Sequence, residues 1–190
     1  MSWDSYMLSM ARATAENSKC LSRKIGAVIT RDNRIVSTGY NGPPVGMLPC
    51  THLNHAVKEE ALAKLGRPLR DLELTKPEGG PQCPRRALGY GSGEGLHICP
   101  ATHAEVNAII SAARMGVSVD GGTMWLTCEV PCQRCLGQII NAGISEVVVT
   151  SWRNYDALSR CILAASPITI RLNTGVPPQG RTWPVPFYER

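Results

Sequence analysis

The chain has 190 residues, of which 43% are hydrophobic and 18% are charged. This composition excludes intrinsic disorder, and the length suffices for one globular domain with a sizeable core. No apolar run approaches the ~20 residues that span a bilayer, so we expect no membrane partner. The net charge of +5 suits an anionic small molecule. One Phe, four Trp and five Tyr are too few for a base-stacking platform, which argues against nucleic acid as a partner.

The N-terminal stretch MSWDSYMLSMARATAENSK has no basic start followed by an apolar block, so no secretory signal is predicted. We therefore expect a cytoplasmic protein, which for a viral chain means the host cytoplasm. Thiols stay reduced there. The eight cysteines are then expected to be metal ligands or small buried residues rather than disulfide partners.

In chain order, residues 3–17 carry apolar side chains at the spacing of an opening helix. Two β-rich runs, 25–30 and 34–40, flank the turn-forming residues 31–33, which predicts a hairpin. A loop rich in Gly and Pro follows at 41–46.

A single domain is expected to span residues 1–190, with a loop-rich insertion at about 51–98. Within the insertion, residues 54–66 are predicted to form a helix that ends at Gly66. The Pro- and Gly-containing tail from about 173 is predicted to run extended over the surface.

The chain after the insertion alternates between helix and strand patterns. Helices are predicted at 103–116, 132–143 and 155–165, and strands at 123–127, 146–151 and 168–172. Such alternation predicts an α/β sandwich with a mixed sheet, whose first two strands are antiparallel and whose later strands are largely parallel.

The segment PCQRC, Pro131 to Cys135, fits a redox dithiol, half of a structural zinc site or part of a catalytic metal centre. His103 and Glu105 open one predicted helix, and Cys132 and Cys135 open the next. A strand between the two helices brings both helix N-termini to the same edge of the sheet. One imidazole and two thiolates then leave a fourth tetrahedral position for water, the arrangement of a catalytic zinc.

Glu105 is predicted to carry protons rather than to bind the metal. Two residues from His103, it is badly placed as a ligand but well placed to take a proton from the water and pass it to a substrate. An interaction with the helix dipole would contribute only about 0.3–1 kcal/mol and would not require this spacing. A redox dithiol leaves both residues without a role, so a catalytic zinc is favoured.

An H-x-E segment followed by P-C-x-x-C is the mark of zinc nucleobase deaminases. Within that group the chain resembles deoxycytidylate (dCMP) deaminases. Residues 18–46, SKCLSRKIGAVITRDNRIVSTGYNGPPVG, are similar to their N-terminal signature. HAEVNAI and PCQRC are similar to their two zinc segments, and INAGISEVV to the stretch after the second. The resemblance covers most of residues 15–150.

This resemblance implies a three-layer α/β/α sandwich with a central mixed five-stranded sheet, as in cytidine deaminase-like proteins. It implies Zn²⁺-dependent hydrolysis of dCMP to dUMP and ammonia for thymidylate synthesis, by a homohexamer that dCTP activates and dTTP inhibits. One alternative is a deaminase of dCTP, of a modified dCMP, or of a base in tRNA or single-stranded DNA. Another is a catalytically silent zinc protein that binds nucleotides as a regulator, although such a protein would not need Glu105.

The resemblance also offers residues for substrate binding. Asn41 matches a family position near the sugar and base, although a turn before Gly42 explains it as well. Arg23 and Lys24 are candidates for the 5′-phosphate, although exposed basic pairs are usually just solvated. Tyr155 is a candidate to flank the base or touch the phosphate, with a core or helix-start role as the alternative.

Four cysteines outside the catalytic motif resemble the ligands of a second, structural Zn²⁺ in related deaminases: Cys20, Cys50, Cys83 and Cys99. Four thiolates close a tetrahedral site with no open position. The alternative is that they are small buried residues without a metal. Three histidines are substitute ligands: His52, His55 and His97. The other two cysteines, Cys128 and Cys161, are expected in the core.

Two positions match segments linked to the effector response of the family, Gly42 and Arg114. A triphosphate effector needs cationic groups beyond those for a monophosphate, and hexamer interfaces can hold two arrangements. Stabilisation of a helix C-terminus explains an arginine at position 114 equally well.

Overall fold

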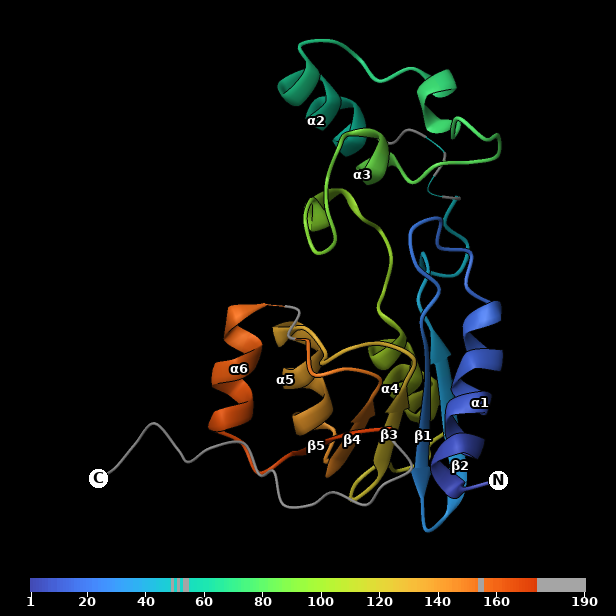
Figure 1. Ribbon diagram of the computed structural model, residues 1–190, viewed down its shortest axis with the longest axis vertical. Helices are drawn as coiled ribbons and strands as arrows, with labels where there is room; N and C mark the ends of the chain where they lie inside the picture. Colours follow the sequence, from blue (N-terminus) through green and yellow to red (C-terminus); the bar gives the residue numbers. More distant parts are fainter. Residues whose placement is uncertain (49, 51, 53–54, 154–155, 174–190) are drawn as a thin grey trace, which may run out of the picture. The chain divides into compact units, whose positions relative to one another are not determined.

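The computed structural model describes residues 1–48, 50, 52, 55–153 and 156–173. They form two compact units (Figure 1). The first consists of residues 1–18, 25–41 and the chain from 103 onward, and the second of residues 19–24 and 42–102. Beyond Asn173, the predicted extended tail lies outside the described residues. None of the described helices combines the length and the apolar character that a membrane-spanning segment needs.

A five-stranded mixed sheet in the order β2-β1-β3-β4-β5 forms the centre of the first unit (Figure 1). β1 pairs antiparallel with both β2 and β3, whereas β3, β4 and β5 are parallel. This confirms the predicted mixed sheet. The strands are β1 (Gly26–Arg31), β2 (Arg34–Tyr40), β3 (Thr123–Leu126), β4 (Glu146–Val149) and β5 (Thr169–Leu172).

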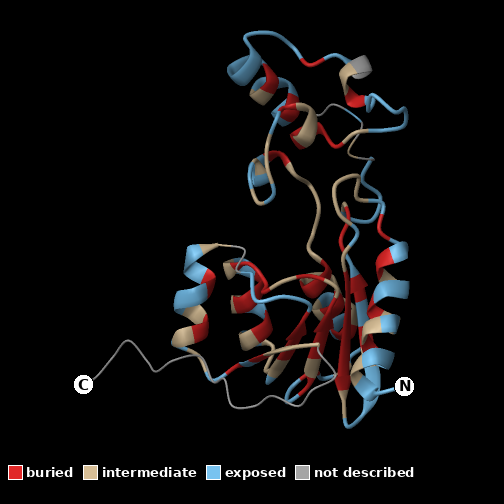
Figure 2. Ribbon diagram, viewed as in Figure 1, coloured by how far each residue is buried: buried red, intermediate tan, exposed pale blue. Residues whose placement is uncertain are grey.

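Helices cover both faces of this sheet, which confirms the three-layer α/β/α sandwich. Successive strand residues point to opposite faces, so one strand serves two cores. On one face Val28 packs with Met7 and Ala11 of α1 (Trp3–Glu16). On the other, Ala27 and Ile29 belong to a larger core that includes three helices: α4 (Ala104–Arg114), α5 (Gln133–Asn141) and α6 (Ala157–Ala164). Figure 2 shows the buried residues concentrated in the strands and on the inner sides of these helices.

The predicted hairpin is confirmed, because Asp32 and Asn33 both have positive φ angles, 51° and 57°, between β1 and β2. Two residues of this kind form the turn whose twist matches that of the strands. The helix stop predicted at Gly143 is also confirmed, because Gly143 follows α5 with a φ of 80°. Only glycine adopts that angle at little cost.

The end of β2 is held closely against the start of α4. A Cβ atom added at Gly39 would lie 2.4 Å from the carbonyl oxygen of Ala104 and 2.2 Å from the nitrogen of Ala108, so only glycine permits this approach. The Asn107 side chain donates to the Tyr40 carbonyl at 2.7 Å. These contacts set the position of the first turn of α4, and with it the residue that precedes the helix, His103.

The second unit has short helices around a small apolar core. Its elements are α2 (His55–Leu65), η1 (Asp71–Leu74), α3 (Pro84–Ala87) and η2 (Leu96–Ile98). The helix expected over 54–66 is confirmed, and Gly66 follows it with a φ of 67°. The core residues are Val57, Ala61, Leu69, Leu74, Leu88 and Ile98. The insertion therefore has some apolar packing of its own.

Candidate metal centre

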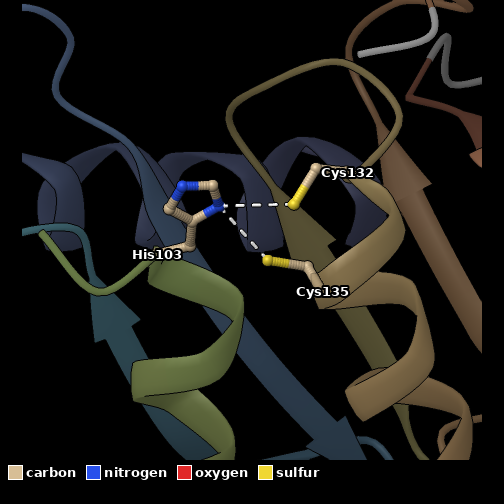
Figure 3. Close-up of side chains that lie close together, drawn as sticks. All are labelled: His103, Cys132 and Cys135. Carbon is tan, nitrogen blue, oxygen red and sulfur yellow. Dashed lines mark hydrogen bonds between the residues drawn. The ribbon is translucent and has the colours of Figure 1, made fainter. Parts of the chain in front are cut away.

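His103, Cys132 and Cys135 converge in the first unit (Figure 3). The His103 Nδ1 atom lies 3.6 Å from the Cys132 sulfur and 3.2 Å from the Cys135 sulfur. The ligand atoms of the three side chains all lie within 4.8 Å of one another. In the part of the chain that the structure describes, no other three His, Cys, Asp or Glu side chains meet this condition.

Two helix N-termini position these ligands. His103 is the N-cap residue of α4 and Cys132 that of α5, and both have extended backbone angles. Neither side chain makes a capping hydrogen bond to its own helix. Both side chains are directed instead toward the shared centre (Figure 3). The positive ends of the two helix dipoles favour thiolate at this place.

The contact between the two thiols shifts their pKa values in opposite directions. The hydrogen bond from Cys135, followed by that from His103, lowers the pKa of Cys132 to about 4. The same contact with Cys132, together with burial, raises the pKa of Cys135. Both cysteines are buried, whereas His103 is half-buried. A cation would be needed to hold both sulfurs as thiolates side by side.

Glu105 lies in the first turn of α4 and is only 4% exposed. Burial raises the pKa of its carboxyl group, and the charge on His103 opposes that shift. Interactions with Cys132 and Cys135 act on the same carboxyl group. The structure therefore places a buried acid beside all three candidate ligands, where it can exchange a proton close to a bound metal.

Asn41, the predicted substrate residue, follows β2 and is 7% exposed. Its Oδ1 atom accepts the Ile25 N–H at 2.8 Å and lies 2.8 Å from the Ser18 hydroxyl oxygen. Because a backbone N–H can only donate, this contact defines which end of the amide is oxygen. Sequence reasoning did not identify Ser18, since nothing local marks a partner 23 residues away.

The structure describes four of the remaining predicted substrate and effector residues. Arg23, Lys24 and Gly42 belong to the second unit. Arg114 is the exposed last residue of α4. Tyr155 lies outside the described residues.

The four other predicted ligands line one cavity of about 270 Å³ in the second unit. Burial, and after it the neighbouring thiols of the other three cysteines, raises the pKa of Cys50 to about 11. His52 also lines this cavity. The cavity-lining cysteines are Cys20, Cys50, Cys83 and Cys99. Of the two expected core cysteines, Cys128 is buried as predicted, whereas Cys161 is exposed, so that prediction was wrong.

Two residues at the start of α6 also contact the metal-binding segment, and sequence reasoning did not single them out. Asp156 accepts the Gln133 N–H at 2.9 Å, and Ser159 donates its hydroxyl to the Pro131 carbonyl at 3.0 Å. The D-A-L-S pattern indicates a helix N-cap. It does not reveal that the cap reaches a second helix.

The chain matches the family of the cytidine and deoxycytidylate deaminase zinc-binding region over residues 1–151. It is 34% identical over 171 residues to the deoxycytidylate deaminase of Schizosaccharomyces pombe, covering 90% of this chain and 44% of that protein. It is 35% identical over 158 residues to the deoxycytidylate deaminase of Enterobacteria phage T2, covering 76% of this chain and 77% of that protein. The chain thus spans somewhat less than half the length of the S. pombe relative.

Among solved structures, the chain resembles dCMP deaminase from the cyanophage S-TIM5 in complex with dCMP and dUMP. The TM-score is 0.57 at 22% sequence identity, over 89% of this chain and 94% of that chain. At this identity the likeness concerns the fold.

Proposed function

Because the chain belongs to the cytidine and deoxycytidylate deaminase family, we propose that it catalyses the hydrolytic deamination of dCMP to dUMP and ammonia. The observation that carries the proposal is the convergence of His103, Cys132 and Cys135 beside the buried carboxyl group of Glu105. The names of the S. pombe and phage T2 relatives support dCMP as the substrate. The product dUMP would supply thymidylate synthesis.

The three ligand side chains fit Zn²⁺. One imidazole nitrogen and two thiols form a donor set that zinc prefers, and three protein ligands are typical of catalytic zinc sites. The lowered pKa of Cys132 favours its thiolate form, which a divalent cation stabilises. Zinc held there would supply a Lewis acid and would lower the pKa of water towards about 7.

Glu105 is the proton carrier of the proposed reaction. Its carboxylate accepts a proton from water and delivers it to N3 of the cytosine ring as the water oxygen adds to C4. It then takes the proton of the new C4 hydroxyl group and passes it to the departing amino group, which leaves as ammonia while the C4 carbonyl forms. Burial raises the pKa of this carboxyl group and so makes it a better proton donor near neutral pH than an exposed glutamate. The net reaction consumes one water and releases one ammonia.

Substrate binding is proposed for Asn41, whose amide orientation is held by the Ile25 N–H and by Ser18. A preorganised amide costs little conformational entropy when a sugar or base binds. Arg23 and Lys24 are proposed for the 5′-phosphate, and Tyr155 for the base.

Ammonia release tests this function. dCMP, dCTP, a 5-modified dCMP, single-stranded DNA and a tRNA are assayed side by side with the zinc-loaded protein, with Glu105→Gln as the matched blank. We expect release from dCMP at a rate at least ten times that from any oligonucleotide. Release from the oligonucleotides alone would replace the proposed substrate. Zinc-loaded protein that releases ammonia from none of them would be a nucleotide-binding regulator at most.

A second, structural Zn²⁺ is proposed for the cavity lined by Cys20, Cys50, Cys83 and Cys99. The other three thiols each raise the pKa of Cys50, which supports their being close to it. Four thiolates would close the coordination shell and give this zinc a structural role.

We further propose a cytoplasmic homohexamer that dCTP activates and dTTP inhibits, with Gly42 and Arg114 in the effector response. The dCMP saturation curve, measured with and without each triphosphate, tests this regulation. dCTP should shift the curve to lower dCMP concentration, and dTTP should inhibit. An unchanged curve in both cases would contradict the regulation while leaving the catalytic proposal intact.

A further inference from the structure

Hydrogen bonds from α6 hold the backbone on both sides of the metal ligand Cys132. On one side, the Pro131 carbonyl accepts the Ser159 hydroxyl at 3.0 Å. On the other, the Gln133 N–H donates to one carboxylate oxygen of Asp156 at 2.9 Å. The two peptide groups flanking Cys132 are therefore both tied to the first turn of another helix.

Asp156 caps two helices with one carboxylate. Its Oδ1 atom accepts the Ser159 N–H at 2.7 Å, which is an ordinary N-cap bond for α6. Its Oδ2 atom accepts the N–H of Gln133, the first residue of α5. An N-cap side chain normally reaches only the second or third N–H of its own helix, so the first N–H of α5 needs a partner from elsewhere. Desolvation raises the pKa of Asp156, but these N–H donors outweigh it and hold the pKa below its usual value.

This second cap matters because the N-cap residue of α5 is a candidate metal ligand. The Cys132 sulfur lies 3.6 Å from His103 and makes no capping bond to its own helix. Ser159 completes the arrangement, since its side chain is fully buried and its hydroxyl spans from α6 to Pro131. If the Ser159 hydroxyl were removed, a water could take its place as hydrogen-bond donor only where there is space for it.

We propose that Asp156 and Ser159 form a clamp that positions Cys132 for the metal, so that they are positioning residues of the centre rather than only a helix cap. The clamp fixes the peptide groups before and after Cys132, and with them the direction of its sulfur. The inference rests on the proposed metal centre. Groups that orient metal ligands typically change metal affinity by roughly 10- to 100-fold when they are removed.

The most informative variant is Asp156→Asn. Asparagine is a good N-cap residue, so it keeps the bond to the Ser159 N–H and the stability of α6. With that bond kept, its NH2 group replaces the carboxylate oxygen that faces the Gln133 N–H, and an NH2 group donates and does not accept. Ser159→Ala removes the other half of the clamp. As a matched control, Ser2→Ala removes the N-cap of α1, where the Ser2 hydroxyl accepts the Ser5 N–H at 3.2 Å.

Zinc transfer from each zinc-loaded variant to a chromogenic chelator is followed in time. The release phase of this centre is identified as the one missing in His103→Ala. We expect Asp156→Asn and Ser159→Ala to release this zinc roughly 10- to 100-fold faster than the unmodified chain. Ser2→Ala should release it at the unmodified rate. The urea unfolding midpoint of Asp156→Asn should stay close to that of Ser2→Ala.

Release from Asp156→Asn and Ser159→Ala at the unmodified rate would overturn the clamp. Equal acceleration in Ser2→Ala would also overturn it, because the effect would then follow general loss of stability. If the unmodified chain showed no zinc release phase that is missing in His103→Ala, the metal centre itself would be rejected. Failure of the clamp and failure of the proposed function are therefore distinguishable.

Discussion

Glu105 is a buried carboxylic acid whose pKa is influenced by all three candidate metal ligands. A buried acid without a functional partner is costly, since desolvation disfavours its charged form. Its place in the first turn of α4 offsets part of this cost through the helix dipole. The desolvation cost that remains is expected for a carboxyl group whose role is proton transfer rather than stability.

Glu105→Gln should abolish turnover of dCMP while leaving zinc content and dCMP binding unchanged. Glutamine has the same shape but cannot accept and return the proton, so kcat should fall by a factor of about 10² or more. Steady-state kinetics, metal analysis and calorimetric titration with dCMP measure the three quantities. Turnover close to that of the unmodified chain would rule out Glu105 as the proton carrier.

At the scale of elements, the contact of β2 with α4 places His103, and Gly39 permits that contact. Gly39→Ala should lower the free energy of unfolding by about 1–3 kcal/mol, because the new methyl group meets backbone atoms that cannot rotate away. Gly137→Ala on α5 is the matched control, since nothing lies within 4 Å of its added Cβ. It should stabilise the chain by about 0.5–1 kcal/mol through helix propensity.

Urea unfolding of the zinc-loaded variants measures both changes. Gly39→Ala should also lose zinc more readily, because α4 must move away from the sheet. If the two variants changed stability in the same direction, the close approach of β2 and α4 would not be a constraint on the fold.

Arg171 of β5 contacts three other elements of the first unit. From β5 it forms ion pairs with Asp4 of α1 and with Glu146 of β4, and its guanidinium lies 5.0 Å from the ring centre of Trp125. Its side chain is 13% exposed, so water screens these contacts only in part. The two carboxylates use different edges of the guanidinium, and Asp4 is bound by two nitrogens.

Arg171→Met should lower the free energy of unfolding by roughly 1–3 kcal/mol, because two carboxylates lose a charged hydrogen-bond donor. Arg171→Lys should recover only part of this loss, since an ammonium group cannot bind both carboxylates in the same forked geometry. Urea unfolding at low and moderate salt compares the three proteins. Full recovery by lysine would show that charge alone matters at this position.

At the scale of the whole molecule, each of the two compact units contains a cluster of cysteines, and the two clusters differ in the residues that accompany the thiols. The first unit combines two thiols with an imidazole and a buried acid, whereas the second surrounds a cavity with four thiols. Three ligands leave a coordination position open for chemistry, whereas four thiolates do not. The proposed division is therefore one catalytic and one structural zinc.

Protein purified without chelator should contain two zinc ions per chain. Cys83→Ser and Cys132→Ser should each contain one, because each variant removes a ligand from a different cluster. Metal analysis by mass spectrometry gives the counts, and proteolysis of the second unit should accelerate in Cys83→Ser only. A single zinc in the unmodified chain that is lost in Cys132→Ser would remove the structural site.

Local patterns in the sequence determined most of the architecture and the chemistry of the centre. Apolar periodicity and turn residues reflect backbone geometry over a few positions, so they located the helices of the first unit, α2, the hairpin and the strands of the sheet. The residue types of H-x-E and P-C-x-x-C indicate metal binding and proton transfer by themselves, because these are properties of the side chains. Alternating helices and strands then placed His103 and Cys132 at one edge, as the structure confirms.

Only the tertiary structure decided which distant residues hold these groups in place. Ser18 lies beside the Asn41 amide, Asp156 reaches the Gln133 N–H, and Arg171 binds Asp4 across 167 positions. These partners are polar side chains of common types, and no local periodicity marks them. Hydrogen bonds form wherever the path of the chain brings donor and acceptor together, and that path is set by packing of the whole core.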